Sequence, residues 1–74
     1  MDRSQRRELK QIIEMLEDCH GKLQGMSAEE ETKYYNLPSS LQDSENGEAL
    51  EDNAEKLWDA WSDLEMVIGT LKSI

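Results

Sequence analysis

The chain has 74 residues and a mass of 8.5 kDa, which allows one small domain and excludes a large enzyme with its own enclosed active site. Its 17 acidic and 8 basic residues give a formal net charge of −9, which argues against direct binding to nucleic acid phosphates and to an anionic membrane surface. No apolar stretch approaches the roughly 20 residues that a membrane-spanning helix needs. We therefore expect a soluble protein that contacts neither nucleic acid nor membrane directly.

Cysteine usage and the start of the chain bear on its location. Cys19 is the single cysteine, so no internal disulfide can form and nothing in the composition requires an oxidising compartment. The first residues, Met1-Asp2-Arg3, lack the apolar run of a signal peptide. These features predict a cytoplasmic protein.

The first predicted element is an amphipathic helix over residues 3–25. Asp2 and Gln5 stand at the spacing of an N-terminal capping box. The apolar residues that follow are spaced alternately by three and four, the pattern of a helix that packs along one seam. We expect Cys19 to be a small buried residue on this seam, with His20 beside it. The predicted seam residues are Leu9, Ile12, Leu16, Cys19, Leu23 and Met26.

A connector over residues 27–43 follows, and it is expected to contain a short second helix. Ser27 and Glu30 stand at capping-box spacing and predict the start of that helix. Pro38 disfavours helix at the residue before it, so the short helix should stop near Asn36. A connector of about 18 residues is too long for a minimal hairpin turn, so we expect it to fold against the helices.

The last predicted element is a helix over residues 44–73, with Ser44 as its N-cap. A helix of about 30 residues is about 45 Å long, longer than a partner of about 23 residues can cover. The sequence therefore predicts two antiparallel helices of unequal length. The seam of the last helix consists of Leu50, Ala54, Leu57, Trp61, Leu64, Ile68 and Leu71.

Further apolar residues widen the seam of the last helix beyond what one partner helix can cover. Small chains without disulfides or metals often compensate for a small core by association. We therefore predict an all-α, coiled-coil-like hairpin that forms a helical bundle as a homo-oligomer, either a dimer or a higher species. The predicted oligomer interface consists of Trp58, Trp61, Val67 and Ile68.

The titratable residues do not form a complete metal or catalytic motif. Glu29-Glu30-Glu31 resembles the start of the paired-acid Mg²⁺ motif of all-helical nucleoside triphosphate pyrophosphohydrolases, but Lys33 stands where the third acid should be. Cys19 and His20 have no other Cys or His to complete a zinc site, and His20 has no nucleophile to activate. We expect no catalytic residue, no metal, no cofactor and no enzymatic activity.

Charge is segregated along the chain. The first ten residues contain four basic and two acidic side chains, whereas residues 29–65 contain twelve acidic and two basic ones. An acidic helical rod can imitate the phosphates of a nucleic acid and steer onto a basic protein surface, although such charge also serves solubility alone. The predicted partner contacts on the last helix are Glu51, Asp52, Glu55, Asp59 and Asp63.

The adjacent pair Tyr34 and Tyr35 adds a second candidate contact. Two neighbouring aromatic residues on a helix cannot both face inward, so one of them should be partly exposed. It would lie near Glu29 and Glu30, and exposed aromatic side chains are frequent anchors of protein interfaces.

The connector resembles a recurrent pattern in small proteins of bacteriophages and prophages, especially of Firmicutes. That pattern is Glu-Glu, a few residues, then Asn-(Leu/Met)-Pro-x-x-Leu-Gln-x-Ser-x-x-Gly-Glu between two amphipathic helices. Here it is present as Glu29-Glu30, followed by the segment Asn36-Leu37-Pro38-Ser39-Ser40-Leu41-Gln42-Asp43-Ser44-Glu45-Asn46-Gly47-Glu48. The resemblance covers the connector closely and the flanking helices by pattern only.

The resemblance implies a phage or mobile-element origin and action in the host cytoplasm. Small accessory phage proteins often bind and inhibit a host protein, so the leading expectation is a non-enzymatic, anti-CRISPR-like inhibitor of a host protein with a basic surface, such as a defence nuclease. Two alternatives remain open. One is an oligomeric sponge that binds a nucleotide immune signal, and the other is a structural or assembly protein. The sponge would use Arg3, Arg6, Arg7 or Lys10.

Overall fold

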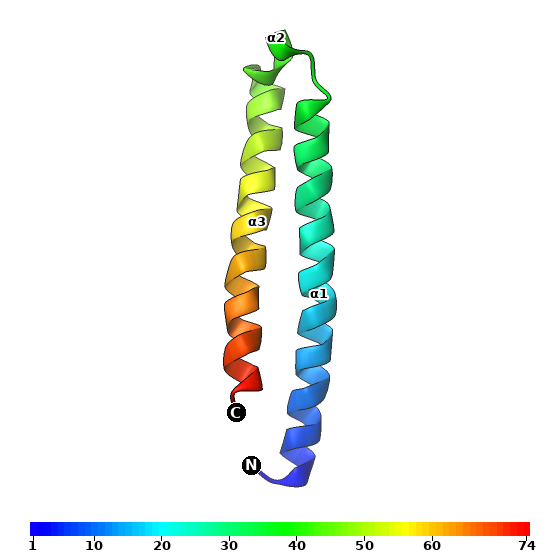
Figure 1. Ribbon diagram of the computed structural model, residues 1–74, viewed down its shortest axis with the longest axis vertical. Coiled ribbons are helices and arrows are strands. Elements are labelled where there is room, and N and C mark those ends of the chain that lie inside the picture. The colour runs from blue at the N-terminus through cyan, green and yellow to red at the C-terminus, as the bar shows by residue number, and fades with distance from the viewer.

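Two long helices lie antiparallel and contact each other along most of their length (Figure 1). The computed structural model describes all 74 residues and contains α1 (Arg3–Tyr35), α2 (Ser39–Gln42) and α3 (Glu45–Lys72). The molecule measures 59 × 14 × 13 Å, the dimensions of two helices side by side. The predicted all-α hairpin with a short helix in the connector is confirmed, although that helix is Ser39–Gln42 and not the predicted one from Ser27 to near Asn36. No helix is both long enough and apolar enough to cross a membrane.

The predicted end of the first helix at residue 25 is wrong, because α1 continues without a break to Tyr35. Ser27 does not cap a new helix. Its side chain is buried in the middle of α1, and its hydroxyl donates a hydrogen bond of 3.0 Å to the backbone carbonyl of Ala54 on α3. This contact with the opposite helix replaces the local cap. The relative lengths are also reversed, since α1 has 33 residues and α3 has 28.

The ends of the long helices follow the predicted capping signals. The backbone N–H of Gln5 donates to the carboxylate of Asp2 at 2.8 Å, and the Gln5 side chain accepts from the N–H of Asp2 at 3.1 Å. At its other end, α1 stops shortly before Pro38, as the missing N–H of proline requires. Ser44 caps α3 by accepting from the N–H of Gly47 at 3.2 Å.

Gly47 lies at a close approach between α2 and the first turn of α3. A Cβ at this position would overlap the backbone carbonyl oxygen of Gln42 and lie 2.7 Å from that of Leu41. Gly47 is one of the three buried residues of the chain. The absence of a side chain therefore lets α2 fold directly onto the start of α3.

The seam of α3 is the one that the sequence predicts, but the seam of α1 is shifted. Ile12, Cys19 and Met26, which were expected on the seam, are exposed. The half-buried or buried positions of α1 are spaced alternately by four and three instead. They are Leu9, Ile13, Leu16, His20, Leu23, Ser27, Glu30 and Tyr34.

The shift follows from what faces α1 across the seam. Leu9, Leu16 and Leu23 belong to both the predicted and the observed seam, so the residues between these leucines decide which seam forms. The His20 ring stacks on the Trp61 ring, with centroids 4.7 Å apart. Ser27, seven residues after His20 on α1, donates a hydrogen bond to the carbonyl of Ala54, seven residues before Trp61 on α3. An antiparallel coiled coil requires this matched step of seven. Cys19 is therefore an exposed thiol and His20 is the seam residue, the reverse of the prediction.

The four residues of the predicted oligomer interface do not form one surface. Ile68 is the single buried apolar side chain, and it lies in the seam of the hairpin. Trp61 packs on His20 within the chain. Trp58 and Val67 are both about half exposed, but Trp58 follows a seam residue and Val67 precedes one, so they lie on opposite sides of the seam.

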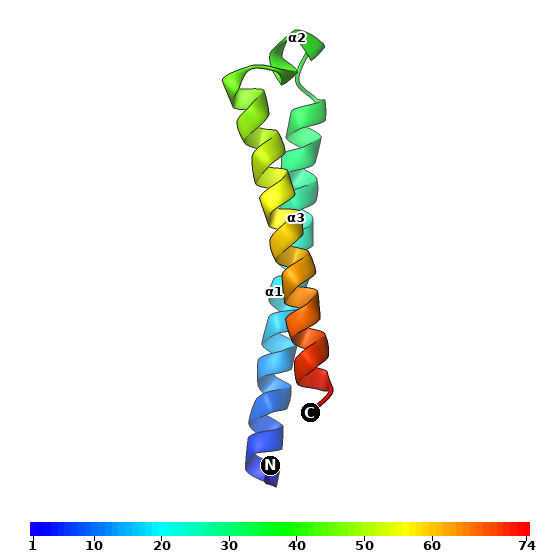
Figure 2. The same cartoon turned by 90° about the vertical axis from the view of Figure 1, so that its left-hand side faces the viewer.

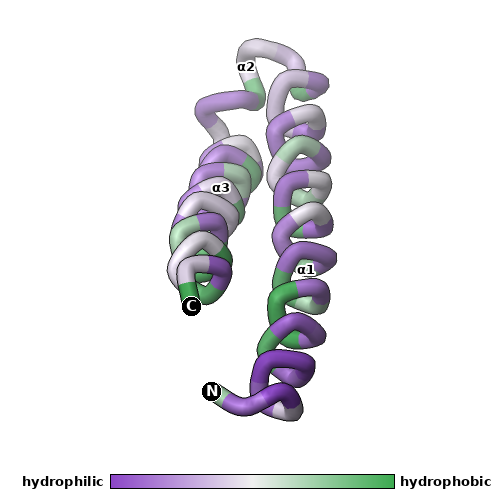
Figure 3. The backbone as a smooth tube through the Cα atoms, turned by 60° about the horizontal axis from the view of Figure 1, so that its bottom comes forward, coloured by the Kyte–Doolittle hydropathy of each residue, from purple (hydrophilic) through white to green (hydrophobic).

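The two ends of the hairpin differ in charge. The first turns of α1 project beyond the C-terminus of α3, as both views show (Figures 1 and 2). These turns are strongly hydrophilic in Figure 3 and contain Arg3, Arg6 and Arg7. The acidic segment, residues 29–65, occupies the connector end and most of α3. The rod therefore has a basic tip and an acidic remainder.

We predict that Gly47→Ala lowers the free energy of unfolding by about 1–3 kcal/mol, because the added methyl group must displace backbone atoms. Gly21→Ala is the matched control. Nothing lies within 4 Å of a Cβ at Gly21, so alanine there should raise stability by about 1 kcal/mol through helix propensity. Thermal unfolding followed by circular dichroism measures both, and equal stability of the two variants would contradict the close packing at Gly47.

Candidate functional site

An open groove of about 360 Å³ lies on one side of the hairpin, between the C-terminal turns of α1 and the N-terminal half of α3. It contains three aromatic side chains and three carboxylates, together with two small residues at its base. We call it the aromatic groove. Its lining residues are Ser27, Glu31, Tyr34, Tyr35, Glu51, Ala54, Glu55 and Trp58.

The groove exists because two small residues face each other across the seam. Ser27 is 4% exposed, and its hydrogen bond to the carbonyl of Ala54 joins the helices directly. Side chains this short do not reach past the seam, so the space beside them stays open. A second groove of about 420 Å³ opens on the other side of the same layer.

The aromatic side chains of the groove are held by stacking. Tyr34 and Tyr35 pack edge to face, with ring centroids 5.3 Å apart and an interplanar angle of 73°. Trp58 stacks on Trp61 at 4.6 Å, and Trp61 stacks on His20 at 4.7 Å, which ties the outer indole to the seam. Tyr35 and Trp58 are 67% and 50% exposed. The groove therefore presents fixed aromatic surface to solvent, as interface anchors do.

The carboxylates of the groove lack cationic partners. Glu31, Glu51 and Glu55 form no ion pair, whereas other acids of the chain pair with lysines. Partial burial raises the pKa of Tyr34 above the usual value of 10.0, and the negative charge of Glu51 raises it further. The groove therefore combines aromatic faces with uncompensated negative charge.

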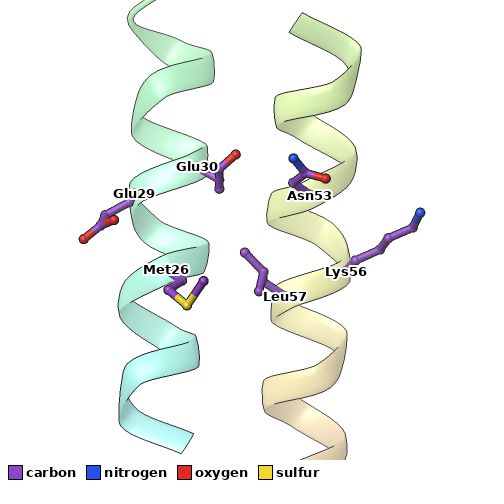
Figure 4. A pocket seen from close by; sticks show the side chains of 6 residues that line it. All are labelled: Met26, Glu29, Glu30, Asn53, Lys56 and Leu57. Atoms are coloured by element: carbon purple, nitrogen blue, oxygen red, sulfur yellow. The ribbon is translucent and has the colours of Figure 1, made fainter. Parts of the chain in front are cut away.

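The second groove has a different character (Figure 4). Met26 and Leu57 point toward each other across the helix gap, and Glu29 and Lys56 point away from it. Glu30 accepts a hydrogen bond of 3.0 Å from Lys33, which lowers the pKa of the Glu30 carboxyl.

The lysines of this side lie next to its acids. Lys56 pairs with Asp52 at 2.9 Å, in addition to the pair between Lys33 and Glu30. Much of the negative charge beside the second groove is thus neutralised within the chain, unlike that of the aromatic groove.

The fold separates the predicted partner residues into three groups. Tyr34, Tyr35, Glu51 and Glu55 meet in the aromatic groove. Glu29 and Glu30 line the second groove instead. The remaining predicted contacts, Asp52, Asp59 and Asp63, are exposed and line neither groove.

Sequence reasoning missed two important groove residues, Glu31 and Trp58. Both immediately follow seam residues, Glu30 and Leu57, and positions of this kind flank a coiled-coil seam on one side. Trp58 was instead assigned to the oligomer interface. The heptad pattern of α3 contained the signal for Trp58, whereas the signal for Glu31 required the correct seam of α1.

The seam beside the groove contains two buried polar atoms without hydrogen-bond partners, His20 Nε2 and Trp61 Nε1. Both belong to the aromatic stack, in which the ring faces of His20, Trp61 and Trp58 are in contact. No group of three or more His, Cys, Asp or Glu side chains is arranged to hold a metal ion. The chemistry available at the groove is therefore that of aromatic faces, hydroxyls and carboxylates.

Comparisons of the chain with protein-family models, with curated proteins and with solved structures find no match.

We predict that Tyr34 ionises at a higher pH than the usual value of 10.0. In a Tyr35→Phe variant, absorbance of tyrosinate during alkaline titration reports Tyr34 alone. Adding Glu51→Gln should lower its pKa without restoring the usual value, because burial is the larger cause. Adding Asp59→Asn, outside the groove, should change it less.

The same shift predicts how stability depends on pH. The folded protein holds the Tyr34 proton more tightly than the unfolded chain, so the contribution of Tyr34 is fully present below the unfolded pKa and is lost as pH rises through the folded value. Stability should therefore fall above about pH 10, and more steeply with Tyr34 than with Phe in its place. A Tyr34 that titrates at or below the usual value would contradict the described environment.

Proposed function

We propose that this chain is a non-enzymatic binding protein that inhibits a host protein by holding one of its basic segments in the aromatic groove. The observation that supports the proposal most is the meeting of Tyr35 and Trp58, both exposed, with the unpaired carboxylates of Glu31, Glu51 and Glu55. Arginine and lysine side chains fit such a surface because they stack on aromatic faces and form charge-assisted hydrogen bonds with carboxylates.

The acidic side chains outside the groove act at longer range than those that line it. The outer acids Asp52, Asp59 and Asp63 extend the negative field along α3 without lining the groove. Fields of this kind accelerate the encounter with a basic partner and fade as salt shortens the screening length. Groove residues thus set the lifetime of the complex, and outer acids set its rate of formation.

The origin of the chain belongs to the same proposal. The connector pattern resembles small phage and prophage proteins, and its glycine and cap have structural roles at the hairpin corner. An acidic inhibitor of phage or mobile-element origin would act in the host cytoplasm on a protein that handles nucleic acid, such as a defence nuclease, whose basic surface complements this rod.

The proposal also includes self-association. A compact monomer of 8.5 kDa is expected to expose about 4,700 Å², whereas the hairpin exposes 5690 Å². Ile68 is its single buried apolar side chain. Folding of so small a chain depends on apolar area removed from water, so a homo-oligomer supplies what the single hairpin lacks.

We predict that a short Arg-rich peptide binds the groove and changes the fluorescence of Trp58. The Glu51→Gln, Glu55→Gln double variant should weaken binding about tenfold or more, since two charge-assisted contacts are lost. The matched control is Asp59→Asn, Asp63→Asn, which removes the same charge outside the groove. It should slow association while leaving the dissociation rate nearly unchanged.

The same variants test the inhibitor itself. Tagged protein captures its target from host lysate, and the groove variant should lose both capture and inhibition while the control retains them. If both double variants behave alike, the groove has no special role and the acids act only through net charge. Thermal stabilisation by a cyclic nucleotide, weakened by Arg6→Gln, would favour the nucleotide sponge instead.

A further inference from the structure

The shift of the α1 seam leaves a row of apolar residues uncovered. These residues line the hairpin on one side, and none of them belongs to the aromatic groove. All six are exposed in the single chain. We call them the apolar strip: Ile12, Cys19, Met26, Ala60, Val67 and Ile74.

The six residues lie on one side of the hairpin. The three α1 residues recur every seven positions, and so do the three on α3, in a series that begins at Asn53. Residues seven apart stay on the same side of a coiled-coil seam. Met26 and Asn53 line the same groove (Figure 4), so both series lie on one side of the hairpin. The opposite side contains the aromatic groove and the ion pair of Glu17 with Lys72, at 2.8 Å.

We infer that the apolar strip is the contact surface with a second copy of this chain, and that the two hairpins lie antiparallel about a two-fold axis near Cys19. The inference rests on the self-association included in the proposed function and adds its surface and orientation. Three features support it: the area left exposed, the order of residue sizes along the strip, and the distribution of charge.

The first feature is area. The hairpin exposes about 1,000 Å² more than a compact monomer of its mass. A stable interface of ordinary size removes about 800 Å² from each partner. Pairing along the strip therefore brings the exposed area of each chain to that of a compact protein. It also converts a two-helix rod into a four-helix bundle with a shared core.

The second feature is the order of residue sizes. Cys19 is the midpoint of α1, with 16 residues of the helix on each side. An axis there places Ile12 at the level of the partner's Met26, so that α1 overlaps its copy over its whole length. The small residues Cys19 and Ala60 then lie near the axis, where two copies approach most closely, and larger side chains lie on either side.

The third feature is charge. An antiparallel pair brings the basic tip of one hairpin, with Arg3, Arg6 and Arg7, beside the acidic connector end of the other. A parallel pair would place the two acidic ends side by side and the two basic tips together. Opposite charges at interacting ends fix the orientation of a complex, and like charges oppose the alternative. The segregated charge thus selects the antiparallel dimer, and both aromatic grooves remain on the outside.

The test begins with adjacent residues on α3. Val67 belongs to the strip and is 48% exposed, whereas Met66 lies outside it and is 73% exposed. By sedimentation equilibrium the unmodified chain should be a dimer of about 17 kDa, twice the 8.5 kDa of one chain. Val67→Glu should raise the dissociation constant at least about 30-fold, and Met66→Glu should leave it nearly unchanged. Equal effects of the two variants would overturn the assigned surface.

The orientation of the two hairpins is tested by cross-linking with a short bismaleimide, which joins two thiols. In a Cys19→Ser background, a mixture of Ile12→Cys and Met26→Cys chains should cross-link far more than either chain alone. A parallel dimer would instead cross-link each variant to itself and would overturn the antiparallel arrangement. Native Cys19 should cross-link to its copy, whereas Met66→Cys in the Cys19→Ser background should not.

The outcomes separate this inference from the groove function. A mass of 8.5 kDa for the unmodified chain at high micromolar concentration overturns the self-association and with it the strip dimer. Peptide binding at the groove does not require the dimer. If the Glu51→Gln, Glu55→Gln variant stays dimeric but binds the peptide as the unmodified chain does, the groove function is overturned and the strip dimer stands. A dimer that persists in Val67→Glu, or one that cross-links in parallel, overturns the strip model while leaving the groove function standing.

Discussion

The structure depends on a single antiparallel seam, because two helices share no other surface. Its alternating spacing of four and three runs from Leu9 to Tyr34 on α1 and from Leu50 to Leu71 on α3. At one layer of this seam, Ser27 meets Ala54, and the short side chains let the helices come close enough for the Ser27 hydroxyl to donate a hydrogen bond to the backbone carbonyl of Ala54. The register set there decides which residues of each helix face inward, and therefore every surface property of the molecule.

The corner of the hairpin supports the same register. Gly47 allows α2 to lie on the start of α3, and Ser44 caps that start through its hydroxyl. Both residues are small, and they act through geometry rather than through buried apolar area. The connector thus has a folding role at the hairpin corner, while the surfaces beside the seam are left exposed.

The two sides of the seam are chemically different, so they suit different partners. One side combines exposed aromatic rings with unpaired carboxylates, the other a row of apolar side chains. A narrow two-helix rod has almost no interior, so such surfaces cannot be hidden by the chain itself. We propose that the aromatic groove binds a basic segment of a partner protein and that the apolar strip binds a second copy of the chain. The aromatic grooves of both copies then remain on the outside of the dimer.

By itself the sequence determined the fold class, the start of α1, both ends of α3 and the whole seam of α3, but not the end of α1, which lies at Tyr35 rather than at residue 25. The features that it determined rest on local chemistry: caps at Asp2 and Ser44 and one unambiguous apolar series. The seam of α1 was different, because Leu9, Leu16 and Leu23 fit two apolar series equally. Counting apolar residues favoured the series with Cys19, and only the contacts of α3 decided for the series with His20 and Ser27. The groove could not be predicted for the same reason, since residues beside a seam are known only when the partner helix has fixed which residues lie in it.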